Sequence, residues 1–420
     1  MRSAASAAVA APLHRRERSE SVSGPLGQKR TPSSLYRVAV NAATRPLRLP
    51  TEASTRRPLR PPTEARTRRP LRLPTEARTR RLANVSAIQE QLEASGAPRS
   101  SQERPSRAAA LAAVAMALPK RRIGNDRIAE LLGIDEEWIV KRTGTCERPW
   151  ASPGERLSDF AARAGRAALE RARLDPADVD LVLVATSSAD EITPNAAPLV
   201  AGLVGAEGAA AFDVGAACTG WLGALALACG YIESGRARHA LVVGADFLSR
   251  FLDTSDRDTL PLFADGAGAA VISHAADGQP GIGPVALHSD SGGAELIRLE
   301  RGGRIRMRGP DTFRAAVRSL AEVTLEALTL AGCTLADIDL FVYHQANSRI
   351  IRAVGQRLGL PSERVVDYVS RFANSSTATL PIALAVAERE GRLRGGDRVL
   401  LAAFGGGFTW GGTVVSWPAR

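Results

Sequence analysis

The chain has 420 residues, of which 45% are hydrophobic, 24% charged and 5% aromatic, and its formal net charge is +11. This length has room for two ordinary domains or for one large duplicated domain. Of the 55 Lys and Arg and the 44 Asp and Glu, 21 and 8 lie in residues 1–106, which leaves 34 and 36 in residues 107–420. The body of the chain is therefore near neutral, and we expect no nucleic-acid partner for it.

The cysteine content, the apolar runs and the motif spacings argue against three further kinds of protein: a disulfide-stabilised domain, a membrane-spanning protein and a protein with a metal site. Four cysteines in a chain of this length do not make a disulfide framework, and we interpret them as a reduced, cytoplasmic set in which one residue is a candidate nucleophile. No run of 18 apolar residues predicts a membrane span, and no CxxC or HExxH spacing predicts a metal site. The cysteines are Cys146, Cys218, Cys229 and Cys333.

Residues 1–106 form a basic tail that contains a twelve-residue repeat. Each unit is rich in Pro, Arg, Thr and Glu and buries too little apolar surface to offset the entropy of ordering, so we expect disorder. A dispensable upstream segment is the interpretation we favour. A targeting peptide, which the acidic residues of the tail fit poorly, and a basic docking arm remain alternatives. The repeats are RPLRLPTEASTR, RPLRPPTEARTR and RPLRLPTEARTR, at 45–56, 57–68 and 69–80.

Strand and helix patterns alternate along residues 107–420. Continuous apolar runs such as DLVLVATSS are typical of strands buried on both faces, and apolar residues at helical spacing predict helices between them. This alternation predicts a layered α/β fold. In chain order we expect a strand at 108–118, helices at 128–144 (with a break at Gly133) and 158–174, a strand at 180–188, a helix at 220–235, and strands at 239–246 and 266–273.

The second part of the body repeats the order of the first. ADVDLVLVA begins at Ala177 and ADIDLFVYH at Ala336, and ALVVGAD and VLLAAFG begin with the same offset, at Ala240 and Val399. Each half closes on a Gly-rich turn and a strand. We infer an internal duplication, and we expect functional residues at matching places of two halves that share one site. The predicted divisions are a tail at 1–106, an N-terminal half at 107–278 and a C-terminal half at 279–420.

Cys218 is the leading candidate for a nucleophile. It lies in DVGAACTGW, between a strand pattern and the start of a long apolar helix pattern. At that place the positive end of the helix dipole stabilises a thiolate and is expected to lower the thiol pKa. A small buried side chain is the alternative, which we favour for Cys229 and Cys333.

Two polar residues of the second half fall at matching places. His344 follows the strand DLFVY, whereas the corresponding residue of the first half is Ala185, so the fold itself does not require a histidine there. Asn374 lies in ANSSTATLP, the turn that corresponds to the one holding Cys218, and a helix N-cap is its alternative role. The duplication thus predicts that the three side chains surround one centre.

The C-terminal loop AFGGGFTWGG, residues 403–412, is the fourth candidate element. Three consecutive glycines weaken a strand and usually mark close approach of the backbone. A backbone N–H of this loop, with that of Cys218, is a candidate oxyanion hole for a thioester carbonyl. A tight bend is the alternative.

Together these residues resemble β-ketoacyl-acyl carrier protein synthase III, the initiating condensing enzyme of bacterial fatty acid synthesis, and its relatives in polyketide pathways. The resemblance covers about residues 107–420, with DVGAACTG, SDRDTLPLFADGAGAAV, YHQANSRII, ANSSTATLP and AFGGGFTWG in family order. It implies a thiolase-like duplicated five-layered α-β-α-β-α fold, usually as a homodimer. It also implies condensation of an acyl-CoA with malonyl-acyl carrier protein to a 3-ketoacyl product, without a metal or redox cofactor.

The resemblance further implies roles for single residues. Cys218 would be the acylated nucleophile, and His344 and Asn374 would support decarboxylation. Gly406 would supply the second oxyanion N–H, and Arg349 would dock the acidic carrier protein. The coenzyme A and pantetheine contacts would be Trp138, Arg142, Arg257, Met307, Gly309, Phe313 and Asn347.

One position bears on the acyl chain, and a few alternatives remain. Thr193 in DEITPNAAP stands where some members have a bulky aromatic residue, which predicts an acyl pocket with room for longer or branched chains.

A thiolase would need a second cysteine in the C-terminal loop, an elongating ketosynthase a second histidine at 374, and a type III polyketide synthase a different C-terminal loop. An acyltransferase of the same family that moves an acyl group to a hydroxyl or amine remains open. A non-catalytic docking protein also remains, although the complete Cys–His–Asn set argues against it.

Overall fold

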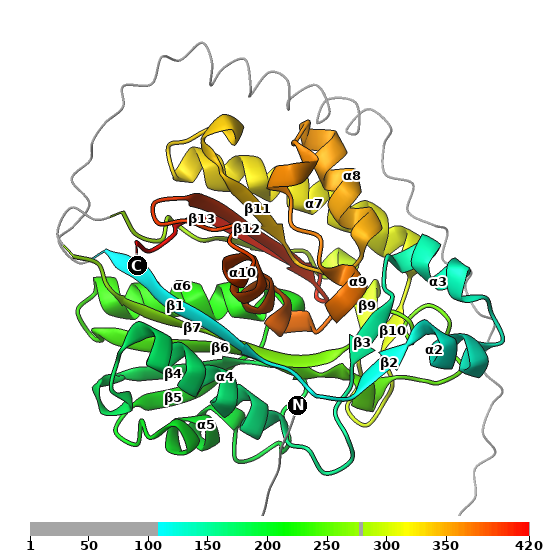
Figure 1. Cartoon of the computed structure of the whole chain (residues 1–420), viewed down its shortest axis with the longest axis horizontal. Coiled ribbons are helices and arrows are strands. Elements are labelled where there is room, and N and C mark those ends of the chain that lie inside the picture. The colour runs from blue at the N-terminus through cyan, green and yellow to red at the C-terminus, as the bar shows by residue number, and fades with distance from the viewer. Residues whose placement is uncertain (1–107, 277–279, 420) are drawn as a thin grey trace, which may run out of the picture. The chain divides into compact units, whose positions relative to one another are not determined.

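The computed structural model describes residues 108–276 and 280–419, which form two β-sheets and the helices that pack on them (Figure 1). The predicted tail and the predicted division at 278/279 lie outside the described residues. Two helices lie between the sheets, and two more cover the outer face of each sheet. The five layers confirm the predicted α-β-α-β-α order. The inner helices are α6 (Gly220–Glu233) and α10 (Thr379–Arg389), and the outer ones are α4 (Leu157–Ala172) and α5 (Ala196–Val204) on one sheet and α7 (Gly309–Leu330) and α8 (Ser348–Leu358) on the other.

The first sheet belongs to the N-terminal half. The strand β4 pairs in parallel with β5 and β6, whereas β7 pairs antiparallel with β1 and β6. Because helices cover both faces, β4 and most of β6 are buried apolar runs. The edge strand β5 leads into the turn that holds Cys218. The strand order is β1 (Ala109–Ala117), β7 (Asp265–His274), β6 (His239–Phe247), β4 (Leu181–Ala185) and β5 (Ala210–Val214).

The second sheet belongs to the C-terminal half. β11 and β12 are parallel, and β13 pairs antiparallel with β12 and β8. His344 directly follows β11, and the Gly-rich loop joins β12 to β13. The strand order is β11 (Leu340–Tyr343), β12 (Arg398–Gly405), β13 (Thr409–Ser416) and β8 (Ala286–Ser289).

The two halves repeat the same local hydrogen bonds at corresponding positions. The Asp180 carboxylate accepts the backbone N–H of His239 at 3.1 Å, and its counterpart Asp339 accepts that of Arg398, which corresponds to His239, at 2.8 Å. Each bond ties the residue before one strand to the first residue of the neighbouring strand. The first residues of the inner helices, Gly220 and Thr379, also correspond. The predicted duplication is therefore confirmed.

Two predicted elements differ in their bounds. The two helices expected within 128–144 are α2 (Asn125–Leu132), which begins three residues earlier than expected, and α3 (Glu136–Thr143); they are separated as predicted at Gly133, which has a φ of 62°. The expected strand at 180–188 ends at Ala185, because the hydroxyls that follow turn towards a buried carboxylate. The short helix α5 is apolar throughout and was not predicted. The remaining short elements are β2 (Arg122–Gly124), β3 (Glu147–Pro149), β9 (Ile297–Arg298), β10 (Arg306–Met307) and α9 (Val369–Phe372).

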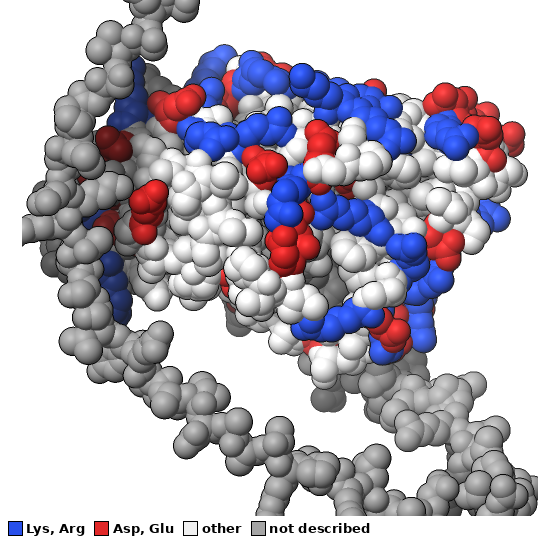
Figure 2. Space-filling model, turned by 90° about the horizontal axis from the view of Figure 1, so that it is seen from below, with Lys and Arg blue, Asp and Glu red and all other residues white. Residues whose placement is uncertain are grey.

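The surface of the described residues carries charges of both signs. Figure 2 shows Lys and Arg side chains interspersed with Asp and Glu on the face it draws, beside a wide area without charged side chains. This mixture agrees with the near-neutral balance of residues 107–420. No helix in the described parts of the chain has both the length and the apolar character to cross a membrane.

Candidate active site

Two turns at corresponding places of the duplicated fold meet between the sheets. The 3₁₀ helix Ala217–Thr219 leads into α6, and the 3₁₀ helix Ser376–Ala378 leads into α10. Each begins with a residue in the left-handed region, with φ of 44° at Ala217 and 51° at Ser376. Residues other than glycine rarely adopt this backbone conformation. The surrounding structure therefore holds both turns, and the side chains on them, in a defined geometry.

A cavity of about 510 Å³ has Cys218 of the first turn in its wall. Cys218 enters it from the start of α6, His344 from the end of β11, and Asn374 from the turn before α10. The structure thus brings the three predicted residues together, although they come from three separate elements and from both halves of the chain.

The environment of Cys218 corrects one expectation. The side chain is partly accessible through the cavity but is otherwise enclosed by protein. This burial raises the pKa of the Cys218 thiol to about 12, while a hydrogen bond from Ser376 favours the thiolate and the Asp246 carboxylate disfavours it. The predicted lowering of the thiol pKa is therefore wrong, because loss of water outweighs the helix dipole.

His344 is buried and held by a hydroxyl and an aromatic ring. Its Nδ1 lies 2.6 Å from the Thr379 hydroxyl oxygen, and its ring meets the Phe404 ring edge-on with centroids 5.4 Å apart. Burial lowers the pKa of His344 to about 3, so the imidazole is neutral at physiological pH. The Thr379 hydroxyl also lies 3.0 Å from the Ser376 carbonyl oxygen, so its one proton has two acceptors within reach.

Asn374 is fixed by its own turn. The side-chain Oδ1 accepts the backbone N–H of Ser376 at 2.8 Å, which leaves the two Nδ2 protons as the remaining donors of the carboxamide. Its backbone bonds to Leu262 and Ala264 tie the turn to the N-terminal half. The alternative role as the N-cap of α10 does not hold, since that helix begins only at Thr379.

Gly405, the last residue of β12, lies directly against the nucleophile. A Cβ atom at this position would be 2.7 Å from the backbone nitrogen of Cys218. The corresponding residue of the first half is Asp246, whose carboxylate accepts the backbone N–H of Thr377, the counterpart of Cys218, at 3.1 Å. The glycine therefore leaves the Cys218 N–H without the carboxylate that its counterpart has. Gly406 follows in the turn to β13, beside the backbone of Ile297.

The rest of the cavity wall contains all the residues that the resemblance assigned to coenzyme A. The guanidinium groups of Arg142 and Arg257 lie 5.5 and 4.5 Å from the centre of a Trp138 ring, within cation–π range. Arg349 lies 5.3 Å from the Phe313 ring centre. The lining includes Trp138, Arg142, Arg257, Met307, Gly309, Phe313, Asn347 and Arg349.

Asn347 has a structural role in addition to its place in the wall. Its side-chain oxygen accepts the backbone N–H of Arg349 at 2.8 Å and so caps helix α8. Its amide nitrogen donates to the backbone oxygen of Arg142 at 3.1 Å. The carboxamide thereby ties the start of α8 and the end of α3 together around the cavity.

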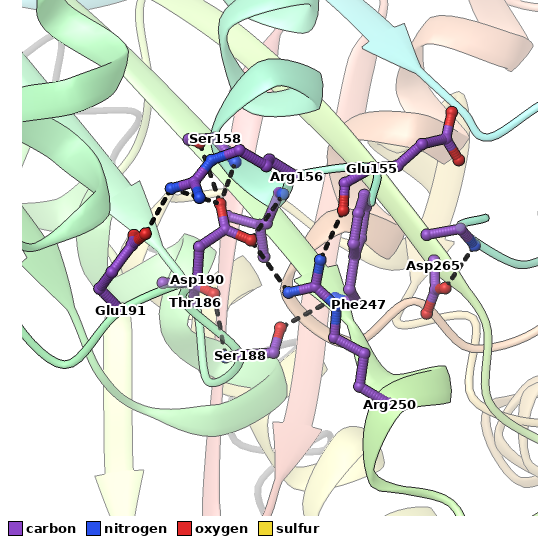
Figure 3. Close-up of polar contacts among 12 residues, drawn as sticks. Glu155, Arg156, Ser158, Thr186, Ser188, Asp190, Glu191, Phe247, Arg250 and Asp265 are labelled. Atoms are coloured by element: carbon purple, nitrogen blue, oxygen red, sulfur yellow. Dashed lines mark hydrogen bonds and ion pairs between the residues drawn. The ribbon is translucent and has the colours of Figure 1, made fainter. Parts of the chain in front are cut away.

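Thr193 does not lie in the cavity of its own chain. The residue is exposed and does not contribute to the cavity wall. Figure 3 shows the reason at the base of its loop: the Asp190 carboxylate accepts from the backbone of Ser158 at the start of α4 and from the Arg250 guanidinium, both at 2.9 Å. These bonds hold the loop beside an outer helix. The assignment of Thr193 to the acyl pocket therefore stays a prediction.

Four residues beside the sulfur and the imidazole were not predicted. Thr379 and Phe404 contact His344, and Ser376 and Asp246 act on the pKa of the Cys218 thiol. The duplication carried a signal for Ser376, which stands at the position that corresponds to Ala217. Asp246 gave no comparable signal, because it ends an apolar strand pattern that predicts burial and not a partner.

Known proteins share the sequence of both halves. Residues 212–291 match the family model of 3-oxoacyl-[acyl-carrier-protein] synthase III, and residues 328–417 match the model of its C-terminal part. A β-ketoacyl-[acyl-carrier-protein] synthase III of Rhizorhabdus wittichii is 44% identical over 306 residues, which cover 71% of this chain and 96% of that protein.

Solved structures agree with this family match. The crystal structure of a 3-oxoacyl-[acyl-carrier-protein] synthase III from Aquifex aeolicus is 38% identical with a TM-score of 0.72, over 74% of this chain and all of that one. The priming β-ketosynthase of the R1128 polyketide pathway is 35% identical with a TM-score of 0.72, over 76% of this chain and 99% of that one. The chain belongs to the β-ketoacyl-[acyl-carrier-protein] synthase III family of the thiolase superfamily.

Proposed function

We propose that Cys218, His344 and Asn374 of this chain carry out the condensation of an acyl-CoA with malonyl-acyl carrier protein to a 3-ketoacyl carrier protein. The observation that carries the proposal is that a thiol, a neutral imidazole and a carboxamide from three elements share one cavity wall. Membership of the family supports the reaction class, which initiates fatty acid or polyketide chains. No step uses a metal or a redox cofactor.

In the first half-reaction Cys218 attacks the thioester carbon of acyl-CoA. The negative charge that develops on the thioester oxygen needs preorganised donors. The Cys218 N–H is one, because Gly405 leaves it without a carboxylate, and the Gly406 N–H is the second in our proposal. Collapse of the tetrahedral intermediate breaks the bond to the coenzyme A sulfur and leaves an acyl group on Cys218.

In the second half-reaction His344 and Asn374 donate hydrogen bonds to the thioester oxygen of malonyl-acyl carrier protein. Loss of CO2 leaves an enolate whose charge these donors stabilise, and one such donor is typically worth about 2.7–4 kcal/mol. A neutral His344 donates from Nε2 when its Nδ1 accepts from the Thr379 hydroxyl, which lies within 2.6 Å. The enolate carbon then attacks the acyl carbon and releases the Cys218 sulfur.

The charged and aromatic lining suits both substrates. Arg142 and Arg257 flank Trp138 and supply positive charge and a flat ring for the phosphate-bearing adenine end of coenzyme A. Arg349, beside Phe313 in the same wall, is placed to meet the acidic carrier protein. We further propose a homodimer, in which Thr193 of one copy reaches the acyl pocket of the other, and a cytoplasmic location, where reduced thiols and both substrates occur.

Separation of the two half-reactions tests the proposal. In one assay the full chain is mixed with acyl-CoA and the acyl group on the protein is measured by mass. In the other, CO2 release from malonyl-acyl carrier protein is measured. We expect Cys218→Ala to abolish acylation but to retain CO2 release, and His344→Ala and Asn374→Ala to retain acylation but to lose CO2 release about 100-fold or more.

The same assays separate the remaining alternatives. An acyltransferase that uses a hydroxyl or amine would be acylated at Cys218 but would release no CO2 from malonyl-acyl carrier protein. A docking protein would do neither, and either outcome would contradict the proposal.

A further inference from the structure

Two threonine hydroxyls join the turn that holds Cys218 to the loop that holds Gly406. Thr219 directly follows Cys218 and ends its 3₁₀ helix, and Thr409 is the first residue of β13. Their Oγ1 atoms lie 2.9 Å apart, although the two residues are 190 positions apart in the chain. The contact therefore links the two halves directly beside the nucleophile, and neither hydroxyl has a role in the mechanism proposed above.

Each hydroxyl also reaches a backbone carbonyl of its own turn. Thr219 Oγ1 lies 2.7 Å from the Ala216 oxygen, and Thr409 Oγ1 lies 3.2 Å from the Gly406 oxygen. A hydroxyl has one proton and two lone pairs. Thr219 donates to the Thr409 oxygen and shares this proton with the Ala216 carbonyl, while Thr409 donates to the Gly406 carbonyl. The hydrogen bonds thus run without a break from the turn of Cys218 to the peptide group of Gly406.

The Gly-rich loop needs restraints from outside, because glycine has the largest backbone freedom of all residues. Gly406 lies between two other glycines, whereas an oxyanion hole requires N–H groups that are held in place before the charge develops. On one side of it Gly405 packs on the nucleophile turn, and on the other side Phe408 and Asp290 exchange two backbone hydrogen bonds of 2.9 and 2.8 Å. The Thr409 hydroxyl restrains the Gly406 carbonyl itself.

The corresponding places of the other turn have no such pair. Strand pairing puts Thr409 opposite Gly405, and it puts Gly266 opposite the counterpart of Gly405 in the first half. The counterpart of Thr219 is Ala378. Because neither counterpart has a hydroxyl, the duplicated fold itself does not require this bridge. The pair occurs at the turn that carries the sulfur, which points to a role in the chemistry of that turn.

We propose that Thr219 and Thr409 are positioning residues of the first half-reaction, an inference that rests on the proposed oxyanion hole of Cys218 and Gly406. Their hydroxyl pair holds the two backbone N–H groups in a fixed relation to each other. Both N–H groups then meet the thioester oxygen as negative charge develops on it. The two hydroxyls act through the backbone and do not exchange a proton with the substrate.

The two half-reactions depend differently on this bridge. Acyl transfer to Cys218 places negative charge in the oxyanion hole, whereas CO2 release places it on an oxygen that His344 and Asn374 contact in the proposed mechanism. His344 is bonded to Thr379, and Asn374 is bonded within its own turn, through contacts that do not include the threonine pair. Loss of the pair should therefore slow acylation and leave CO2 release unchanged, which a general loss of packing would not do.

Rapid-quench acylation of the full chain by acetyl-CoA, followed by mass, tests the bridge. Thr219→Val and Thr409→Val keep the shape of the side chain and remove the hydroxyl. We expect each to slow acylation at saturating acetyl-CoA about tenfold or more, with CO2 release from malonyl-acyl carrier protein within about twofold of wild type. The double variant should be about as slow as the slower single variant, because both changes remove the same bridge. Thr219→Ser and Thr409→Ser keep the hydroxyl and should acylate nearly as fast as wild type.

Thr413 supplies the matched control. It lies on the same strand as Thr409, is fully buried, and donates to the Gly283 carbonyl at 2.9 Å, away from the cavity wall. Thr413→Val should leave the acylation rate unchanged.

Four results would overturn the bridge. They are Val variants that acylate like wild type, CO2 release that falls as much as acylation, single effects that multiply in the double variant, and Ser variants as slow as the Val variants. A wild-type chain that is never acylated would instead overturn the proposed function itself.

Discussion

At the Cys218 sulfur two effects of opposite sign compete. A helix N-terminus stabilises a nearby anion by about 0.3–2 kcal/mol. Burial raises the thiol pKa from 9.0 to about 12, which corresponds to about 4 kcal/mol against the thiolate. The effect of burial is therefore the larger one, and a base must accept the thiol proton during attack. The sequence indicated the dipole but could not indicate the enclosure, which is built by residues of both halves.

This balance predicts a specific pH dependence for alkylation of Cys218. Because the thiol pKa lies near 12, the thiolate fraction should grow about tenfold for each pH unit between pH 7 and pH 10. We expect the rate of iodoacetamide modification at Cys218, followed by peptide mass, to rise through this range without a plateau. The exposed Cys146 serves as the internal comparison. A plateau at Cys218 below pH 8 would contradict the account.

The neutral His344 depends on one hydroxyl for its tautomer. Thr379→Val is nearly isosteric and removes the donor to Nδ1, so the proton is no longer held on Nε2. We expect CO2 release to fall about tenfold or more, with acylation of Cys218 little changed. Thr329→Val, which removes a hydroxyl bonded to a helix carbonyl on the exposed side of α7, should change neither rate. Equal rates in Thr379→Val and wild type would exclude this role.

At the scale of elements, the duplicated fold explains why the site could be predicted as far as it was. The constant offset between the halves placed Asn374 opposite the turn of Cys218 and His344 at the end of the corresponding strand. The same alignment pairs Asp246 with Gly405, but it did not reveal that this pair decides which of the two backbone N–H groups, that of Thr377 or that of Cys218, is bonded to a carboxylate. The sequence did not show that Thr193 lies outside the cavity of its own chain, because the contacts of Asp190 with an outer helix are tertiary and no local pattern shows them.

The packing of β12 on the nucleophile turn gives a prediction for Gly405→Ala. The new Cβ would lie 2.7 Å from the Cys218 nitrogen, so the turn must shift. We expect a destabilisation of about 1–3 kcal/mol in urea unfolding and a large loss of acylation. Gly202→Ala in helix α5, where no atom lies within 4 Å of the added Cβ, should be neutral or stabilising. Full acylation by Gly405→Ala would contradict the proposed oxyanion hole.

At the scale of the whole molecule, the layered order followed from the alternation of buried strands and helices, whereas the cavity did not. The cavity wall draws on both halves, from Trp138 in α3 to Phe404 in β12, and only the packed structure assembles it. The lining residues were predicted from the family resemblance, and the structure shows that they share one cavity wall. Spacing alone would have found none of the coenzyme A contacts.

Burial of His344 links the site to the stability of the fold. Its pKa is about 3 in the folded chain, against an ordinary value of 6.5, so the unfolded chain binds the extra proton between these values. The contribution of His344 to the free energy of unfolding is fully present above pH 6.5 and decreases as the pH falls. At pH 5 about 2 kcal/mol of it is lost. We expect His344→Gln to lack this part of the loss when urea unfolding is compared at pH 7 and pH 5. An identical pH dependence in both proteins would contradict the burial of a neutral imidazole.

The acyl group on Cys218 is the central claim, and one measurement tests it most directly. The full chain is incubated with acetyl-CoA, its mass is recorded, and the modified peptide is mapped before and after addition of malonyl-acyl carrier protein. We expect one acetyl group per chain, located on Cys218, which disappears as 3-ketoacyl carrier protein forms. An acetyl group on another residue, or one on Cys218 that malonyl-acyl carrier protein cannot discharge, would contradict the account.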